Sequence, residues 1–342
     1  MTTDQPSSLI SRRPEFQGAS HHTWRSPGAP AGKASVDVII PCCNYGRFLR
    51  DSVQSVLAHQ DLTLRVLIID DASTDDTVTV AQELCALDSR VQFQQHADRM
   101  GHIATFNEGI DWADGDYMLI LSADDLLLPG ALNRAAHVMN EHPEVHLTVG
   151  WTVNGQPGVA VIPDPVSTCG YVVLEGYRFI EMECALAANT VFSPTAVVRT
   201  LVQKKLGGYH STLPHSADME MWLRFAAHGS VGIVNWFQAF YRVHQRNMSR
   251  QYGILEDLQQ RKAAFEIFFQ EFGFRVRQRT EYEGMVRRQL ALAALHAMRG
   301  AYERQAYGEA ADPDALLAFA QSTWPAIRWE WFNLVSQGVH KA

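Results

Sequence analysis

The chain has 342 residues, of which 46% are hydrophobic, enough for a large core in one or two domains. Its 37 acidic and 29 basic side chains give a net charge of −8, which argues against non-specific binding to nucleic acid. The five cysteines form neither a CxxC pair nor a zinc-binding spacing, so a reducing compartment is expected. No apolar segment has the length of a membrane span or the form of a signal peptide, and the cytoplasm is the simplest location.

Residues 1–34 are rich in Ser, Pro, Gly, Gln and His and show no hydrophobic period, which predicts a disordered leader. From Ser35 onward, apolar runs alternate with helical patterns. Buried strands are predicted at Val36–Ile40 (ended by Pro41), Leu64–Ile69, Val91–Gln95 and Tyr117–Leu121. Helices are predicted at Arg47–Ala58, from the turn ASTDDT to Leu87, and at His102–Trp112. This alternation predicts an α/β fold with a doubly wound, mostly parallel sheet and flanking helices.

Two adjacent acids, Asp124 and Asp125, follow the fourth predicted strand in the sequence LSADD. Mutual repulsion and desolvation oppose the ionisation of such a pair, and a bound Mg²⁺ or Mn²⁺, which prefers oxygen ligands, would remove that cost. Alternatively, either acid could cap the helix suggested by LLLPGALNRAAHVMN, with Pro129 near its first turn. The two residues alone leave both interpretations open.

Polar residues follow three of the predicted strands: Pro41–Asn44, Asp70 with Asp71, and Asp124 with Asp125. Parallel sheets bind ligands at the carboxyl ends of their strands, so these segments are expected to meet in one crevice. The first turn, PCCNYG, holds a single glycine, and no G-x-G-x-x-G or P-loop is present. Dinucleotide redox chemistry and ATP hydrolysis are therefore disfavoured. Adjacent Cys42 and Cys43 are interpreted as small buried residues rather than as a strained disulfide.

Five ordered blocks, spanning about Ser35 to Ser249, resemble family 2 glycosyltransferases with the GT-A fold. The blocks are VDVIIPCCNYGRFLRDSVQSVLAHQ, LIIDDASTDDT, GHIATFNEGI, GDYMLILSADDLLLPGAL, and GGYHSTLPHSADMEMWLRFAAHG followed by YRVHQRNMS. The resemblance implies a GT-A domain at residues 35–250. It also implies inverting transfer of a sugar, from a UDP-sugar by family frequency, to the hydroxyl of a glycan or lipid-linked glycan acceptor in polysaccharide biosynthesis.

The resemblance also implies residue roles on the donor side. Asp71 would hydrogen-bond the nucleotide base. Asp124 would lie near the donor ribose or sugar, and Asp125 would ligate a divalent cation most directly. Further donor contacts would come from Pro41, Cys42, Asn44, Asn107 and Ser122. Ser122 departs from the commoner DADD and leaves fewer carboxylates for the metal, and Phe106 stands where many relatives carry Arg.

In the fifth block, Asp218 matches the catalytic base, although Ala217 replaces the usual preceding Glu. From the residues alone, Asp218 could instead be a helix N-cap, because a clear helical pattern follows it. His244 matches a position that binds the metal or the diphosphate in some members. His215 and Asn189 are weaker candidates on the acceptor side.

Residues 251–342 show helical patterns with aromatic residues and end in TWPAIRWEWFNLV, which predicts a C-terminal helical extension that packs against the catalytic domain or joins two copies of the chain. A second interpretation places the protein peripherally at the inner face of the membrane, since this region carries Arg275, Arg277, Arg279, Arg287 and Arg288. The competing function is a non-catalytic sugar-nucleotide- or partner-binding protein on a decayed GT-A fold, which the departures at Ser122 and Ala217 motivate.

Overall fold

The structure is a computed structural model that describes residues 20–23, 34–155, 170–305 and 312–327. The chain divides into two compact units, each described by itself. The first comprises the chain up to Phe179, together with Val191–Thr212 and Arg224–Asn247. The second comprises Ile180–Thr190, Leu213–Leu223 and the chain from Met248 onward. Two internal segments thus group with the C-terminal helices, and the predicted domain boundaries at 34/35 and 250/251 stay predictions.

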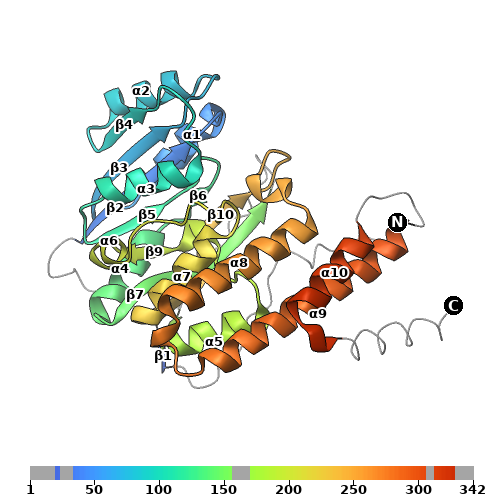
Figure 1. The fold of residues 1–342 in the computed structure, drawn as a ribbon. Coiled ribbons are helices and arrows are strands. Elements are labelled where there is room, and N and C mark those ends of the chain that lie inside the picture. Colours follow the sequence, from blue (N-terminus) through green and yellow to red (C-terminus); the bar gives the residue numbers. More distant parts are fainter. Residues whose placement is uncertain (1–19, 24–33, 156–169, 306–311, 328–342) are drawn as a thin grey trace, which may run out of the picture. The chain divides into compact units, whose positions relative to one another are not determined.

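The first unit is built on one mixed sheet with the order β1-β8-β10-β7-β9-β5-β2-β3-β4, in which β6 pairs with β10 (Figure 1). Strands β4, β3, β2 and β5 are mutually parallel, as are β7 and β10, whereas the remaining pairs are antiparallel. The strands are β1 Ser20–Thr23, β2 Ser35–Cys42, β3 Thr63–Asp70, β4 Val91–Gln95, β5 Tyr117–Ile120, β6 Leu126–Leu127, β7 Val145–Gly155, β8 Gly170–Leu174, β9 Val197–Arg199 and β10 Ser230–Arg242.

Helices connect these strands as the alternating pattern predicts. They are α1 Gly46–Leu57, α2 Thr77–Leu87, α3 His102–Trp112, α4 Ala131–Glu141, α5 Gly176–Leu186, α6 Thr200–Leu206 and α7 Ala217–His228, with a 3₁₀ turn at Ser193–Thr195. Helices α1, α2 and α3 link the parallel strands β2, β3, β4 and β5 in chain order, which confirms the predicted α/β architecture.

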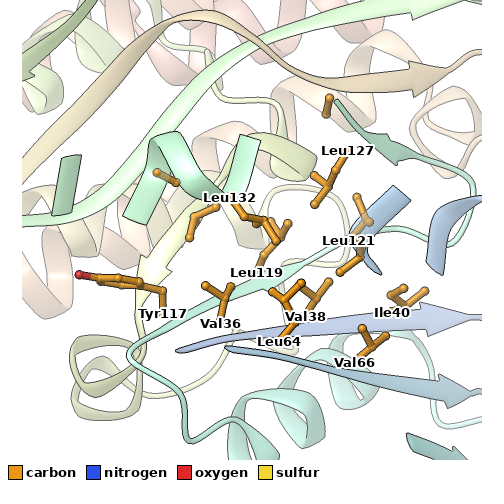
Figure 2. Packing of buried hydrophobic residues seen from close by; sticks show 14 of the residues in the cluster. Val36, Val38, Ile40, Leu64, Val66, Tyr117, Leu119, Leu121, Leu127 and Leu132 are labelled. Atoms are coloured by element: carbon orange, nitrogen blue, oxygen red, sulfur yellow. The ribbon is translucent and has the colours of Figure 1, made fainter. Parts of the chain in front are cut away.

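Alternate residues of the parallel strands build the core on one face of the sheet. Figure 2 shows Val36, Val38 and Ile40 of β2 beside side chains of β3 and β5, with Leu132 of α4 above them. On the opposite face, α3 lies so close to β2 that a Cβ on Gly109 would sit 2.4 Å from Ile39 Cγ2. Because both faces are covered, β2, β3 and β5 contain near-continuous apolar runs, whereas the edge strand β4 is mostly polar.

Three sequence expectations need correction. Strand β2 does not end at Pro41 but continues to Cys42. Proline has no backbone N–H to donate, and none is required on the side of β5, because the pairing of β2 with β5 stops at Ile39. Helix α4 begins at Ala131 after Gly130, whose φ is 77°, so neither acid of LSADD caps it. Within the predicted leader, Ser20–Thr23 form β1 by edge pairing with β8, which needs only backbone groups, whereas residues 1–19 and 24–33 lie outside the described part.

The second unit contains α8 Ile254–Phe272, α9 Arg279–Gln305 and α10 Pro313–Thr323, with 3₁₀ turns at Met248–Gln251, Gly273–Arg275 and Pro325–Ile327. These helices pack against one another through buried Phe265, Phe268, Leu290 and Leu295, which confirms a helical C-terminal region (Figure 1). The aromatic segment from Trp329 onward lies outside the described residues. Among the described helices, none combines the length and the apolarity that a membrane crossing requires.

Candidate active site

The turns that follow β2 and β3 are tied together at the carboxyl edge of the sheet. Asn44 has a φ of 60°, a left-handed conformation that Asn tolerates, and its backbone N–H donates to Ser73 Oγ at 2.8 Å. Its Oδ1 accepts from the Thr74 backbone N–H at 2.8 Å, and the Asp71 N–H donates to Cys42 O at 2.8 Å. The two strand ends therefore form one rigid surface, and the Asn44 side chain serves in holding it.

Pro41 and Cys42 enter this surface differently. Pro41 is half-buried, whereas Cys42 is 3% exposed and its thiol contacts Thr77 Oγ1 at 3.8 Å. Burial raises the pKa of the Cys42 thiol to about 12. The Cys43 thiol contacts Asp71 O instead, so the adjacent thiols have separate partners and both are free.

The Asp71 carboxylate holds the loop between β4 and α3 through hydrogen bonds. Its carboxylate accepts hydrogen bonds from His96 Nδ1 at 2.9 Å, Met100 N–H at 2.6 Å and Gly101 N–H at 2.9 Å. Burial opposes its ionisation, but these donors outweigh burial and hold the pKa of Asp71 below its ordinary value. A carboxylate has about four acceptor positions, and beside these three donors Arg99 Nε lies 3.9 Å from Oδ2 in an ion pair.

His96 lies between two carboxylates, with Nε2 2.7 Å from Glu108 Oε2 on its other side. Burial favours the neutral ring, yet the hydrogen bonds with Asp71 and Glu108 raise the pKa of His96 above its ordinary value. The second predicted strand end therefore carries an acid whose pKa is lowered, beside a half-buried histidine whose pKa is raised.

The predicted donor-binding residue Asn107 has its amide directed at a neighbouring loop. Its Oδ1 accepts from the Tyr209 N–H at 2.6 Å, and its Nδ2 donates to Tyr209 O at 3.0 Å. A Cβ on Gly208 would lie 2.4 Å from Asn107 Oδ1, so the glycine of GGYH permits this close approach. The amide thus holds the loop before α7, and a donor contact by Asn107 stays a prediction.

Asp124 gathers three hydrogen-bond donors around its carboxylate and is 4% exposed. Ser122 Oγ donates to Oδ1 at 2.5 Å, while Oδ2 lies 3.0 Å from His244 Nε2 and 3.4 Å from Asn247 Nδ2. The serine that replaces the family's first acid therefore stabilises the neighbouring carboxylate, where a third acid would repel it.

Asp125 points into the protein and is 1% exposed. Its Oδ1 accepts the backbone N–H of Arg242 at 3.0 Å. Burial, and then the adjacent charge of Asp124, raise the pKa of Asp125 well above its ordinary value. The Arg242 guanidinium bonds Asp51 at 2.9 Å and lies 4.8 Å from the Phe48 ring centroid, so it braces α1. Asp125 thus ties the LSADD turn to the end of β10.

His244 is fixed by an aromatic setting and by a defined tautomer. Its ring stacks on Phe48 with centroids 5.3 Å apart and meets Tyr45 edge-on at 5.5 Å. The backbone N–H of Arg246 donates to Nδ1 at 3.2 Å, so Nδ1 carries the lone pair. The neutral ring then has its proton on Nε2, which faces Asp124, and His244 acts there as an N–H donor.

Tyr45, Phe48 and Asn247 were not identified from the sequence. Tyr45 donates through its hydroxyl to Arg246 O at 3.0 Å and, with Phe48, frames His244. Tyr45 and Phe48 lie in the first family block and Asn247 lies in the last, so the resemblance already covered all three residues. Nothing in the local sequence shows that segments about two hundred residues apart meet.

Asp218 lies in the second unit, in the first turn of α7. The first intrahelical bond runs from Glu220 N–H to Ser216 O, which puts Ser216 at the N-cap and leaves Asp218 inside the helix. Asp218 Oδ2 accepts from Asn189 Nδ2 at 3.0 Å. The helix N-terminus favours a negative charge there, so the surroundings of Asp218 suit an ionised carboxylate.

Known proteins are similar to this chain in sequence and in fold. Residues 37–186 match the model of glycosyl transferase family 2. EpsE of Bacillus subtilis (strain 168), which bears the name of a glycosyltransferase, is 28% identical over 214 residues, 61% of this chain and 73% of EpsE.

Two solved structures have a similar fold. The S. aureus TarS 1–349 complex with UDP-GlcNAc has a TM-score of 0.61 at 14% identity, covering 89% of this chain and 92% of that one. Mannosyltransferase PcManGT from Pyrobaculum calidifontis, in complex with GDP-Man and Mn²⁺, has a TM-score of 0.57 at 16% identity, covering 92% and 89%. The family match over residues 37–186, the relative and the shared fold together support a family 2 glycosyltransferase.

Proposed function

We propose that this glycosyltransferase binds a nucleoside-diphosphate sugar at the carboxyl ends of β2, β3 and β5 and transfers the sugar to an acceptor hydroxyl with inversion. The observation that carries the proposal is the convergence on Asp124 of three donors from two segments: Ser122 of the same turn, and His244 and Asn247 of the segment after β10. Such an arrangement holds an anionic carboxylate in a fixed position, which a surface acid with no other task would not need.

The base is assigned to the rigid surface formed by the first two strand ends. Asp71 would accept an N–H of the base, while its other contacts orient it. Uracil, thymine and guanine all present an N–H to such an acceptor. UDP is the donor nucleotide we propose; TarS with UDP-GlcNAc and PcManGT with GDP-Man supply the two classes to compare.

A divalent cation suits the donor set beside this surface. Among the described residues, no group of three or more His, Cys, Asp or Glu side chains is arranged to hold a metal. One carboxylate completed by substrate phosphates and water is nevertheless the usual protein contribution to an Mg²⁺ or Mn²⁺ site with a nucleotide. We assign Asp124 as the ligand from the chain; when bound, the cation would supply Lewis-acid stabilisation of the leaving diphosphate.

The other two predicted metal ligands receive different roles. Asp125, buried and bonded to the Arg242 N–H, positions the turn that carries Asp124. His244 presents Nε2–H, because Arg246 occupies Nδ1, and that proton can serve Asp124 or a diphosphate oxygen. Direct metal ligation by His244 would need the opposite tautomer and the loss of the Arg246 contact.

Asp218 is assigned as the general base. The acceptor oxygen attacks the anomeric carbon while the bond from that carbon to the diphosphate oxygen breaks. A carboxylate oxygen of Asp218 takes the hydroxyl proton, and the nucleoside diphosphate leaves with the bonding electron pair. General-base assistance contributes about 10²- to 10⁴-fold, so Asp218→Asn should lower transfer by about that factor.

A glycan or lipid-linked glycan acceptor, a part in polysaccharide biosynthesis, a cytoplasmic location and association with the inner face of the membrane stay predictions from the resemblance and the C-terminal arginines. An oligomer through the C-terminal helices is likewise a prediction. None of them is needed for the donor-site proposal.

Thermal unfolding with UDP, dTDP and GDP, each with Mn²⁺, with Mg²⁺ and with EDTA, tests the donor site. A ligand present at about 100 times its dissociation constant adds about 2.7 kcal/mol of stability, enough to move the midpoint. A shift for one nucleotide that EDTA removes supports the proposal, and Asp124→Asn should remove the same shift. Absence of any shift would favour a non-catalytic protein on a decayed GT-A fold, which the departures at Ser122 and Ala217 motivate.

A further inference from the structure

The loop after α5 adopts a conformation that needs external support. Ala187 has a φ of 47°, in the left-handed region that residues other than glycine rarely adopt, and it is 1% exposed. Such conformations persist only where neighbouring groups hold them, and they concentrate at functional sites. Two residues later, Asn189 donates through Nδ2 to Asp218 Oδ2 at 3.0 Å.

One anchor of this loop comes from α8. Arg261 Nη1 donates to Ala187 O at 3.1 Å, and the same guanidinium pairs through Nη2 with Asp257 one helical turn earlier. Burial alone would oppose ionisation of Asp257, but His215 and Arg261 outweigh it and hold the pKa of Asp257 below its ordinary value. Arg261 is thus held by one carboxylate while it fixes the carbonyl of the strained residue.

The same turns of α8 hold the segment before Asp218. Asp257 Oδ1 lies 3.0 Å from His215 Nε2, and Gln260 Oε1 accepts the His215 backbone N–H at 3.1 Å. The His215 ring stacks on Tyr252 with centroids 4.1 Å apart and an interplanar angle of 26°. His215 precedes Asp218 by three residues, so α8 fixes the chain on both sides of the Asn189–Asp218 pair.

We propose that α8 is a positioning element for Asp218, with Arg261 as its principal positioning residue acting through the Ala187 carbonyl and the Asn189 amide. This inference rests on the assignment of Asp218 as the general base. It gives the C-terminal region a task in the reaction beyond packing, and it accounts for the grouping of Ile180–Thr190 and Leu213–Leu223 with the C-terminal helices.

Arg261→Ala in the full-length chain tests the proposal, with Lys262→Ala as the matched control. Lys262 is the next residue of the same helix, and its ion pair with Glu266 at 2.8 Å is on the exposed side. The assay follows release of the nucleoside diphosphate from UDP-GlcNAc, UDP-glucose and GDP-mannose with Mn²⁺, with water as the acceptor that takes the sugar and gives its proton to Asp218, below the unfolding midpoint of every variant. Arg261→Ala should lower kcat about tenfold, as expected for the loss of one charge-assisted hydrogen bond, with the donor KM unchanged.

A conservative substitution at Arg261 and a double substitution distinguish a positioning role from a general loss of structure. Arg261→Lys, which keeps a donor for Ala187 O, should recover part of kcat. Asn189→Ala should lower kcat in the parent and in Lys262→Ala. It should add little to Arg261→Ala, because both changes act on Asp218 through the hydrogen bond between Asn189 and Asp218.

The proposal is overturned if Arg261→Ala matches the control, if the donor KM rises in step with the fall in kcat, or if the effects of Arg261→Ala and Asn189→Ala multiply. Asp218→Asn distinguishes this failure from failure of the proposed function. An active Asp218→Asn refutes the base assignment and with it the positioning role. An inactive Asp218→Asn beside a fully active Arg261→Ala refutes the positioning role alone.

Discussion

Replacement of His244 distinguishes an N–H donor from a metal ligand. A glutamine at this position can present its Nε2 amide to Asp124, whereas an alanine cannot, and while the amide donates in this way its oxygen is turned from the position of a cation bound at Nε2 of His244. The donor role therefore predicts that His244→Gln retains much of the binding that His244→Ala loses. The ligand role predicts that both variants fall together.

The magnitude follows from the contacts of Asp124. His244 supplies the hydrogen bond at 3.0 Å to Oδ2, beside a weaker one from Asn247 at 3.4 Å, while Ser122 serves Oδ1. A hydrogen bond to a charged group contributes about 1.5 to 3 kcal/mol, so His244→Ala should weaken binding of UDP with Mn²⁺ by about 10- to 150-fold. His244→Gln loses the ring contacts with Phe48 and Tyr45 and the Nδ1 acceptor for the Arg246 N–H, but it keeps a donor for Asp124 and should stay within about tenfold of the parent.

Calorimetric titration of UDP at saturating Mn²⁺, and of Mn²⁺ at fixed UDP, measures both effects. Phe48→Leu is the control for lost ring stacking, since it keeps the imidazole and its N–H. Equal losses in the Gln and Ala variants, with a matching rise in the Mn²⁺ concentration at half-saturation, would refute the tautomer argument and restore His244 as a ligand.

Three further predictions address the site and the pH dependence of stability. Ser122→Ala should weaken Mn²⁺ binding with UDP at least about tenfold, because an outer partner of a ligating carboxylate is lost, while Ser122→Thr should not; equal titrations of the two variants would contradict this. At Asp37, burial opposes ionisation, but a guanidinium and two backbone amides hold the pKa below its ordinary value. Its contribution to the free energy of unfolding is therefore present above the unfolded pKa of about 3.9 and is lost as the pH falls through the folded pKa. In urea unfolding, the parent should be more stable than Asp37→Asn near neutral pH, and this difference should shrink in acid. At Glu183, burial raises the pKa to about 8, so stability falls as pH rises from about 4.5 to 8, and Glu183→Gln should gain on the parent across that window; parallel pH curves would show that Glu183 does not titrate there.

The fold could be predicted closely where a segment decides its own structure. Strand β4 and helix α3 have the predicted bounds, because the short strand pattern VQFQQ and the helical repeat can each be recognised within one segment of the sequence. The continuation of β2 through Pro41 was not readable, since it depends on where the neighbouring β5 stops. The edge strand β1 was missed for the same reason, because its pairing with β8 uses backbone groups that a polar sequence also has.

The sequence singles out Asp124 and Asp125 together, but it cannot predict how their contacts differ. Asp124 and Asp125 are adjacent, and only the turn geometry decides which carboxylate faces the other donors. Asp125 is turned inward by a hydrogen bond from the Arg242 backbone, 117 residues later in the chain. Such a contact leaves no mark in the local sequence, and since both acids are buried the sequence does not show which of them is bonded to the end of β10.

The matched family blocks also mix residues that build the site with residues that would touch the donor. Asn44 uses its carboxamide oxygen to hold the β3 turn, and Asn107 uses both amide atoms to hold Tyr209. A ligand would have to break these contacts before it could use those atoms, at the cost of unpaired backbone groups. The proposed recognition therefore rests on other groups, chiefly Asp71 for the base and Asp124 with His244 for the diphosphate and its cation. A motif that matches a family at every position can thus identify the architecture of a site more securely than the contacts made within it.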